Sequence, residues 1–131
     1  MGQLKSILLQ DNSLTGPIPS ELGRLSLSRF FASNNHLEGS IPEELWQITK
    51  LIDLRLDGNK IDGSISNSLG NLLQIEKLYL NSNLLTGSLP ISFSAVITLG
   101  TYFFWAQYSI SRYKISFDIS EVDPNPFFPS N

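Results

Sequence analysis

The strongest constraint on the fold is a motif that recurs four times along the chain. It is marked by four asparagines at intervals of 23, 24 and 24 residues, which are Asn12, Asn35, Asn59 and Asn83. Each asparagine is followed by Leu or Ile at the second position, by Gly at the fourth and by Ile or Leu at the sixth. Self-similarity at a period of this length predicts a solenoid, because one coil cannot bury its own apolar side and stacked coils share one core.

The shared unit reads L-x-x-L-x-L-x-x-N-x-L-x-G-x-I-P-x-x-L-G-x-L, and each part of it has a physical role. The L-x-L pair predicts a short strand whose alternate side chains point inward and outward. The asparagine amide can satisfy backbone groups in the bend after the strand, and the Gly permits a backbone conformation that a Cβ would hinder. The Ile-Pro step precedes predicted helical turns around three pairs, Glu21 and Leu22, Glu44 and Leu45, and Ser68 and Leu69. Four leucines should be almost fully buried: Leu54, Leu56, Leu78 and Leu80.

The L-x-G-x-I-P-x-x-L-G ending resembles the plant-type leucine-rich repeats of receptor-like kinases, receptor-like proteins and polygalacturonase-inhibiting proteins, from residue 4 to about residue 96. The resemblance implies an α/β leucine-rich-repeat solenoid of about four to five coils. Short parallel strands would line its concave face, and 3-10 or short helical turns and loops its convex face.

The resemblance also implies a function. We expect a non-catalytic recognition module that binds a protein or peptide ligand on the concave sheet face, with a co-receptor as a further partner. It implies an extracellular, cell-surface location, with membrane association through the parent protein. The chain has no cysteine-bearing cap, kinase domain or signal peptide, so we expect a fragment of an ectodomain.

Three segments are predicted: residues 1–98 as four repeats, 99–122 as a degenerate fifth repeat and C-terminal cap, and 123–131 as an irregular tail. The fifth repeat has Gln107 in place of the asparagine and Ser111 in place of the Gly. Alternating residues at 113–119 predict a closing strand. A membrane span near 91–110 is the alternative, because no charged residue occurs from 78 to 111. Polar residues within this run and the continuing repeat register favour the cap.

Outward side chains of parallel strands should align in columns, and these columns form the candidate binding face. Ten candidate ligand-binding residues follow from the repeat register, namely Leu8, Arg29, Phe31, Asp53, Arg55, Asp57, Lys77, Tyr79, Phe103 and Trp105. In this register two aromatics flank Arg55 and two cations flank Asp53. These residues either stabilise the sheet as cross-strand pairs or serve as binding hot spots, for which aromatics and Arg are typical. The exposed apolar members favour binding.

Composition excludes several functions. Charged residues make up 16% of the chain and the net charge is -3, which argues against nucleic-acid binding. There is no cysteine, so disulfides and thiolate metal sites are excluded, and we expect no metal or cofactor. A carbohydrate-active solenoid enzyme is the remote alternative, but Asp53 and Asp57 lie about 13 Å apart at strand rise, too far for a retaining pair. We therefore expect no enzymatic activity.

The N-terminal end of such a stack should expose part of its core. Five apolar residues form this end, Leu4, Ile7, Leu9, Leu14 and Leu22. The first strand also has an unpaired edge that can add another chain. We therefore expect this end to fray first or to mediate self-association.

Overall fold

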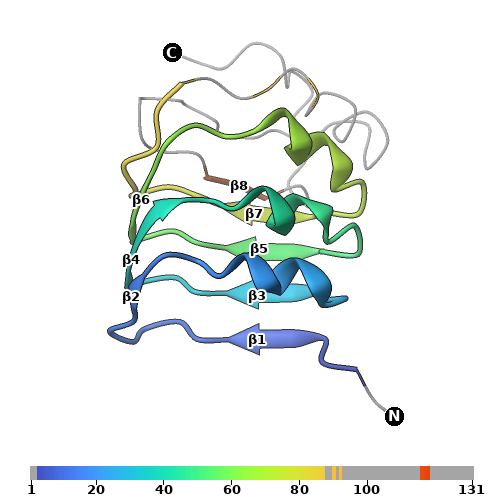
Figure 1. The fold of residues 1–131 in the computed structure, drawn as a ribbon, viewed down its shortest axis with the longest axis horizontal. Helices are drawn as coiled ribbons and strands as arrows, with labels where there is room; N and C mark the ends of the chain where they lie inside the picture. The colour runs from blue at the N-terminus through green and yellow to red at the C-terminus, as the bar shows by residue number, and fades with distance from the viewer. Residues whose placement is uncertain (1–2, 88–89, 91, 93–115, 119–131) are drawn as a thin grey trace.

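A computed structural model describes residues 3–87, 90, 92 and 116–118, and it shows a stack of parallel coils (Figure 1). Each coil places one short strand in a five-stranded sheet, whose order is β1 (Ser6–Leu8), β3 (Arg29–Phe31), β5 (Asp53–Arg55), β7 (Lys77–Tyr79) and β8 (Ser116–Asp118). The first four strands are parallel, and they pair in a register that places equivalent positions of successive repeats side by side. The predicted leucine-rich-repeat solenoid is therefore confirmed.

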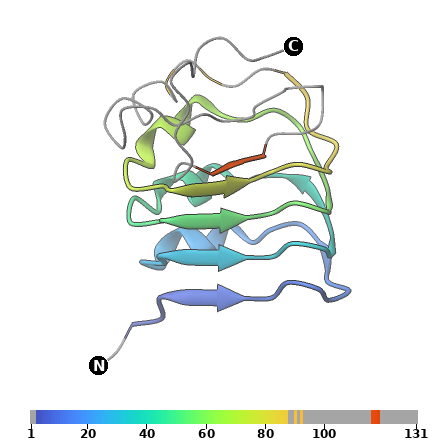
Figure 2. The same ribbon diagram turned by 180° about the vertical axis from the view of Figure 1, so that it is seen from behind.

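Short 3-10 helices lie on the opposite side of each coil from this sheet (Figure 2). They are η1 (Ser20–Arg24), η2 (Glu43–Gln47) and η3 (Asn67–Asn71), and they contain the three predicted helical turns. The residue before each helix is extended, with φ of −68° at Pro19 and −67° at Pro42. Proline fixes φ near this value, so the Ile-Pro step directs the chain into η1 and η2. Ser66 precedes η3 with the same extended conformation, at a φ of −68°.

A second, three-stranded parallel sheet is present that the sequence pattern did not predict. It consists of β2 (Thr15–Gly16), β4 (His36–Ser40) and β6 (Lys60–Asp62). These strands overlap the x-L-x-G part of the repeat, which follows each asparagine, and β4 contains all of it. Gly39 within β4 has a φ of +80°, a conformation that side chains with a Cβ rarely adopt. The repeated Gly therefore allows the chain to bend while it continues to pair with its neighbours.

The core runs continuously between the sheets and the 3-10 helices. Leu54, Leu56, Leu78 and Leu80 all have 0% of their surface exposed, which confirms the predicted burial. Trp46 is a residue of η2, and its side chain belongs to the core because it is 1% exposed. Because successive coils share these apolar contacts, each coil is stabilised mainly by its neighbours.

Buried asparagines connect successive coils, and we call Asn35, Asn59 and Asn83 the asparagine ladder. The Asn59 side-chain oxygen accepts a hydrogen bond from the Leu37 backbone N–H at 3.0 Å. Its Nδ2 donates to the Ala32 carbonyl in the preceding coil at 2.9 Å and to the Leu56 carbonyl in its own coil at 3.0 Å. The same pattern recurs at the two other members of the ladder.

Asn12 differs from the ladder because it is exposed and bonds only within its own coil. Its Nδ2 donates to the backbone carbonyls of Leu9 and Gln10 at 3.0 and 3.1 Å. No described residue donates to its side-chain oxygen. The predicted column of four asparagines is thus present, but only three of them join two coils.

The edge of β7 shows how the stack departs from the predicted register. Sequence reasoning placed residues 101–105 beside this strand, as a fifth parallel member. The structure instead pairs β7 with β8 in the antiparallel direction, with Tyr79 opposite Ser116. Phe103 and Trp105, which the predicted register places in the outer columns, lie outside the described residues. The fifth repeat lacks the asparagine and Gly on which the other coils depend, whereas β8 falls in the alternating segment at 113–119.

The residues of the alternative membrane span, 91–110, lie almost wholly outside the described part of the chain. Among the described residues, no helix has the length and apolar character needed to cross a bilayer.

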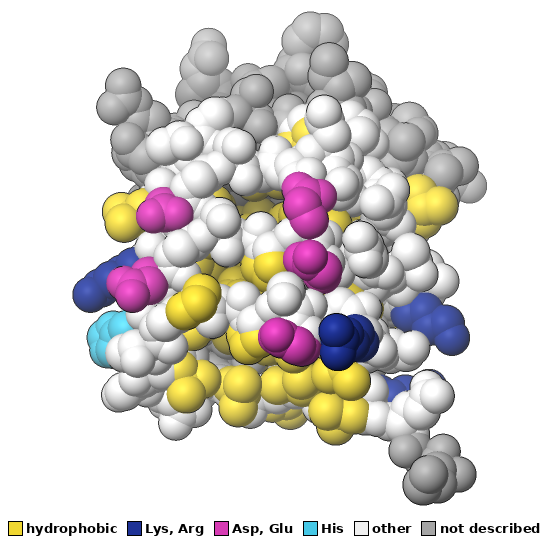
Figure 3. Space-filling view, viewed as in Figure 1, with side chains coloured by type: hydrophobic (Ala, Val, Ile, Leu, Met, Phe, Trp, Pro, Cys, Tyr) yellow, Lys and Arg dark blue, Asp and Glu magenta, His cyan; other side chains and the backbone are white. Residues whose placement is uncertain are grey.

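The N-terminal end of the stack exposes apolar side chains, as predicted (Figure 3). Leu4 is 55% exposed, and Leu9 and Leu14 are each 39% exposed. An apolar hollow of about 240 Å³ opens between the first and second coils, and Ile7 and Leu22 line it. Both of these residues are partly buried against the core.

Candidate functional site

The candidate site is the outer face of the five-stranded sheet, formed by the side chains of β1, β3, β5 and β7 that point away from the core. Pairing between these strands aligns Leu8, Phe31, Arg55 and Tyr79 in one column. A second column contains Arg29, Asp53 and Lys77. The structure therefore brings together the candidate residues that it describes in the predicted order.

Arg55 lies at the centre of this face, between two aromatic rings. Its guanidinium carbon is 4.4 Å from the centre of the Phe31 ring and 5.0 Å from the centre of the Tyr79 ring. Such contacts attract a cation to the ring face and restrict the orientation of the side chain. The predicted flanking of Arg55 by two aromatics is thus a direct stacking contact.

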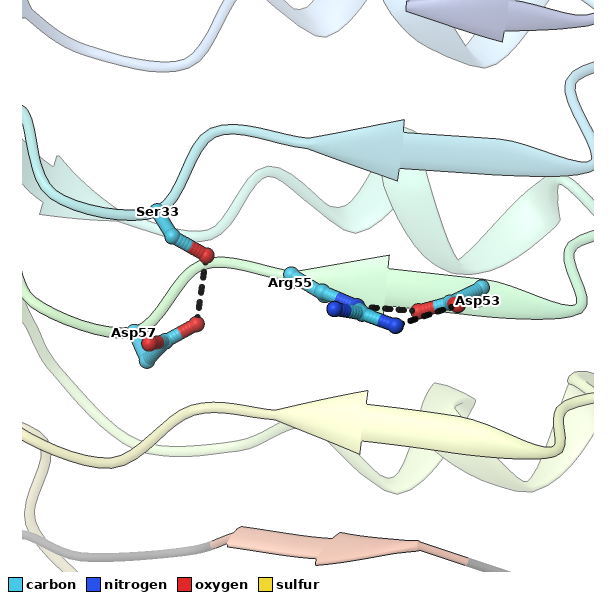
Figure 4. Close-up of polar contacts among 4 residues, drawn as sticks. All are labelled: Ser33, Asp53, Arg55 and Asp57. Carbon is cyan, nitrogen blue, oxygen red and sulfur yellow. Dashed lines mark hydrogen bonds and ion pairs between the residues drawn. The ribbon is translucent and has the colours of Figure 1, made fainter. Parts of the chain in front are cut away.

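Asp53 holds the guanidinium from the same strand (Figure 4). Arg55 Nε donates to Asp53 Oδ1 at 2.9 Å, and a terminal guanidinium nitrogen donates to Oδ2 at 3.0 Å. This hydrogen bonding raises the pKa of Arg55 above its ordinary value. The Asp53 side chain is only 12% exposed and that of Arg55 is 32% exposed, so both partners of the ion pair are largely shielded from solvent.

Sequence reasoning identified Arg29 and Lys77 as the cations beside Asp53, but it missed this pairing with Arg55. The signal was available, because residues at positions i and i+2 of a strand lie on the same face. An Asp-x-Arg sequence in a strand can therefore form an ion pair along the strand as readily as across it. Arg29 itself is exposed, and its side chain makes no ion pair with a described residue.

The carboxylates and amides at the strand exits form a separate group. The Ser33 hydroxyl donates to Asp57 Oδ1 at 2.6 Å, on the side of Arg55 opposite to Asp53 (Figure 4). Asn34 Nδ2 donates to Asp11 Oδ1 at 2.8 Å between the first two coils. Asp11 and Asn34 have φ of 59° and 56°, in the left-handed region that Asp and Asn tolerate better than most residues.

The described residues form two hollows on the outer face, and the stacked side chains separate them. The first has a volume of about 470 Å³ and lies at the strand starts, beside Arg29 and Lys77. The second has a volume of about 330 Å³ and lies at the strand exits, beside Asp57. Phe31 and Arg55 line both hollows, so they form a ridge between them.

The carboxylates at the centre of this face are engaged by other side chains of the protein. Asp53 is engaged by Arg55 and Asp57 by Ser33, so the two carboxylates have different partners. In the part of the chain that the structure describes, no three His, Asp or Glu side chains are close enough together to hold a metal ion. The site thus presents aromatic surface and both signs of charge on a rigid sheet.

Comparison with known proteins identifies the repeat. The family model described as Leucine Rich Repeat matches four consecutive segments, at residues 3–25, 26–48, 50–72 and 74–96. A search of curated protein sequences finds no match.

Solved structures with the same fold include plant receptor ectodomains. One is the ectodomain of the plant membrane receptor kinase GASSHO1/SCHENGEN3 from Arabidopsis thaliana in complex with CASPARIAN STRIP INTEGRITY FACTOR 2, at 41% identity and a TM-score of 0.70 over 78% of this chain and 12% of that one. Another is the plant peptide hormone receptor RGFR1 in complex with RGF2, at 34% identity and a TM-score of 0.70 over 77% of this chain and 16% of that one. The BIR3–SERK2 complex from Arabidopsis thaliana is 35% identical, with a TM-score of 0.68, over 72% of this chain and 51% of that one.

Proposed function

Because the chain belongs to the leucine-rich repeat family and is of the plant type, we propose that it is a non-catalytic recognition module whose outer sheet face binds a peptide or protein ligand. Residues 1–98 would supply the repeats that form this face. Residues 99–122 would form the degenerate fifth repeat and cap, and residues 123–131 an irregular tail.

The observation that carries this proposal is the preorganised stack of Phe31, Arg55 and Tyr79. Aromatic and Arg side chains dominate the binding energy of many interfaces. Here the guanidinium is held by two rings and by both oxygens of Asp53 before any ligand arrives. A ligand therefore meets side chains that lose little conformational freedom on binding.

The known structures support a peptide or protein as the class of partner. Two of them are a peptide hormone receptor in complex with RGF2 and a receptor kinase ectodomain in complex with CASPARIAN STRIP INTEGRITY FACTOR 2, and a third is a complex of BIR3 with SERK2. This chain spans 16% of the length of the first and 12% of the length of the second. We propose by this likeness a peptide or protein ligand, a co-receptor as a second partner, and a cell-surface location.

Selection from a displayed peptide library on the immobilised 131-residue chain tests the proposal. Selected peptides should bind the Phe31→Ala variant at least about fivefold more weakly, because truncation of a hot-spot residue commonly costs more than about 1 kcal/mol. Lys60→Ala is the matched control, since Lys60 is exposed on β6 in the other sheet. Circular dichroism would check that both variants are folded. Peptides that tolerate Phe31→Ala but lose affinity for Lys60→Ala would place the binding surface elsewhere.

A further inference from the structure

The guanidinium of Arg55 keeps donors that its neighbours in the sheet do not use. An arginine side chain has five N–H donors, and Asp53 accepts from two of them, one on Nε and one on Nη2. The rings of Phe31 and Tyr79 approach the guanidinium from the strands on either side. No described residue accepts from the other three donors, which are the second one on Nη2 and both of those on Nη1.

The nitrogen Nη1 points toward the strand exits. Asp53 lies opposite the edge that Nε and Nη2 form, so the planar geometry of the guanidinium directs Nη1 away from Asp53. Asp57 lies on the side of Arg55 opposite to Asp53 (Figure 4). The free donors of Nη1 therefore face the hollow of about 330 Å³ that Arg55 and Asp57 both line.

Asp57 supplies an acceptor in the same hollow. Its Oδ1 accepts the Ser33 hydroxyl, while its second oxygen accepts no hydrogen bond from the described residues. The charge of Asp57 is one of the smaller effects, after the hydrogen bond to Asp53, that raise the pKa of Arg55. Asp57 is thus close to the guanidinium but not hydrogen-bonded to it, which leaves a free donor and a free acceptor in one hollow.

This combination disfavours a ligand group that carries a full charge. A carboxylate that accepted from Arg55 would lie beside Asp57 and near Asp11, which lines the same hollow. An ammonium that donated to Asp57 would lie beside the guanidinium and leave its donors without an acceptor. An uncharged group that accepts and donates at once satisfies both residues.

We infer that this hollow binds the side-chain carboxamide of a glutamine or asparagine of the ligand. The carboxamide oxygen accepts from Arg55 Nη1, and the carboxamide nitrogen donates to the free oxygen of Asp57. Asp53 is then a positioning residue, because its two hydrogen bonds direct Nη1 into the hollow. This inference rests on the proposed function, since it names a side chain that the same face recognises.

Peptides selected from the displayed library provide the probes. Peptides whose binding depends on Phe31 should share a Gln or Asn at one position. Replacing that residue by Leu, or by the corresponding Glu or Asp, should weaken binding at least about tenfold, because hydrogen bonds to two charged groups are lost or a like charge is introduced. Isothermal titration calorimetry with synthetic peptides and the full 131-residue chain measures the affinities.

A variant of Asp57 locates the contact. Asp57→Asn removes the like charge, and its side-chain oxygen can still accept the Ser33 hydroxyl. The preference for the carboxamide peptide over its carboxylate analogue should therefore fall at least about threefold. Asp62→Asn is the matched control, because it makes the same change at an exposed residue of β6 in the other sheet, and it should leave the preference unchanged. Circular dichroism would check that both variants are folded.

Selected peptides that depend on Phe31 but share no Gln or Asn would overturn the inference and leave the proposed function intact. The same holds if the Leu peptide binds as tightly as its parent. A preference that Asp57→Asn leaves unchanged, or that Asp62→Asn lowers equally, would also overturn the inference. Failure to select any peptide would count against the proposed function itself, and the inference would fall with it.

Discussion

Asn59 accepts a hydrogen bond from the Leu37 backbone N–H at a buried position. Its amide also donates to the carbonyls of Ala32 and Leu56, but these carbonyls accept further hydrogen bonds from Asn35 and Asn83. Asn59→Ala would therefore leave the Leu37 N–H without its partner inside the core. We expect the free energy of unfolding to fall by about 1–3 kcal/mol, which is the cost of one buried unsatisfied group. Urea denaturation followed by circular dichroism measures the change.

Asn12→Ala is the matched control for this prediction. Asn12 occupies the same place in the repeat, but it is exposed and bonds only to carbonyls of its own coil. Water can replace these bonds, so the loss should stay within about 1 kcal/mol. Equal losses at the two positions would show that the contribution of the asparagine is local and does not come from linking coils.

Side chains link the N-terminal ends of η2 and η3. Hydrogen bonds from the side chains of Ser66, which has the larger effect, and Ser68 lower the pKa of Glu43 below its ordinary value of 4.5. A carboxyl group with a lower pKa in the folded state than in the unfolded state stabilises the folded protein. The stabilisation is complete at a pH above the pKa of the unfolded state, and it is lost as the pH falls through the pKa of the folded state. Glu43→Gln should therefore be less stable than the natural chain near pH 7, and the difference should shrink below about pH 4.5. Thermal unfolding across this pH range provides the measurement.

Removal of the two donors isolates the cause. In a background with Ser66→Ala and Ser68→Ala, Glu43→Gln should have much less effect at every pH. Ser66 also accepts the Ser68 backbone N–H at 3.0 Å at the start of η3, so the background itself will be less stable. The informative quantity is the difference between Glu and Gln within each background. If that difference persists without the serines, a partner other than Ser66 and Ser68 lowers the pKa.

Across the whole molecule, protection should be lowest at the N-terminal end of the stack. Leu4 and Leu9 are 55% and 39% exposed, whereas Leu54 and Ile61 in the third coil are 0% exposed. Fewer buried contacts mean that local opening costs less free energy. We expect backbone amides at residues 4–14 to exchange much faster than those at residues 54–61 in dilute solution. Hydrogen–deuterium exchange with mass spectrometry resolves both segments.

The same experiment at increasing protein concentration tests self-association through this end. Contact between the exposed leucines of two copies would slow exchange at residues 4–14 and leave residues 54–61 unchanged. Uniform protection that does not depend on concentration would show that the first coil is stable without a neighbour.

The repeat motif, through its spacing and its residue types, predicted the solenoid, the strands, the helical turns and the buried leucines, and the family resemblance added the parallel direction of the strands. These features follow from contacts that recur at a fixed interval, so a position in one coil predicts the same position in the next. The order of side chains along the outer face was predictable for the same reason, as the column through Phe31, Arg55 and Tyr79 shows.

The tertiary structure decided the features that depend on how one coil packs on another. The second sheet, the Asp53–Arg55 pair and the two hollows of the outer face depend on distances and rotamers that a one-dimensional pattern does not contain. The repeat motif does not predict the antiparallel pairing of β8 with β7, because the motif is lost at Gln107 and Ser111. A periodic sequence predicts its own continuation, and where the period ends, only competition between segments for the open strand edge determines which one pairs.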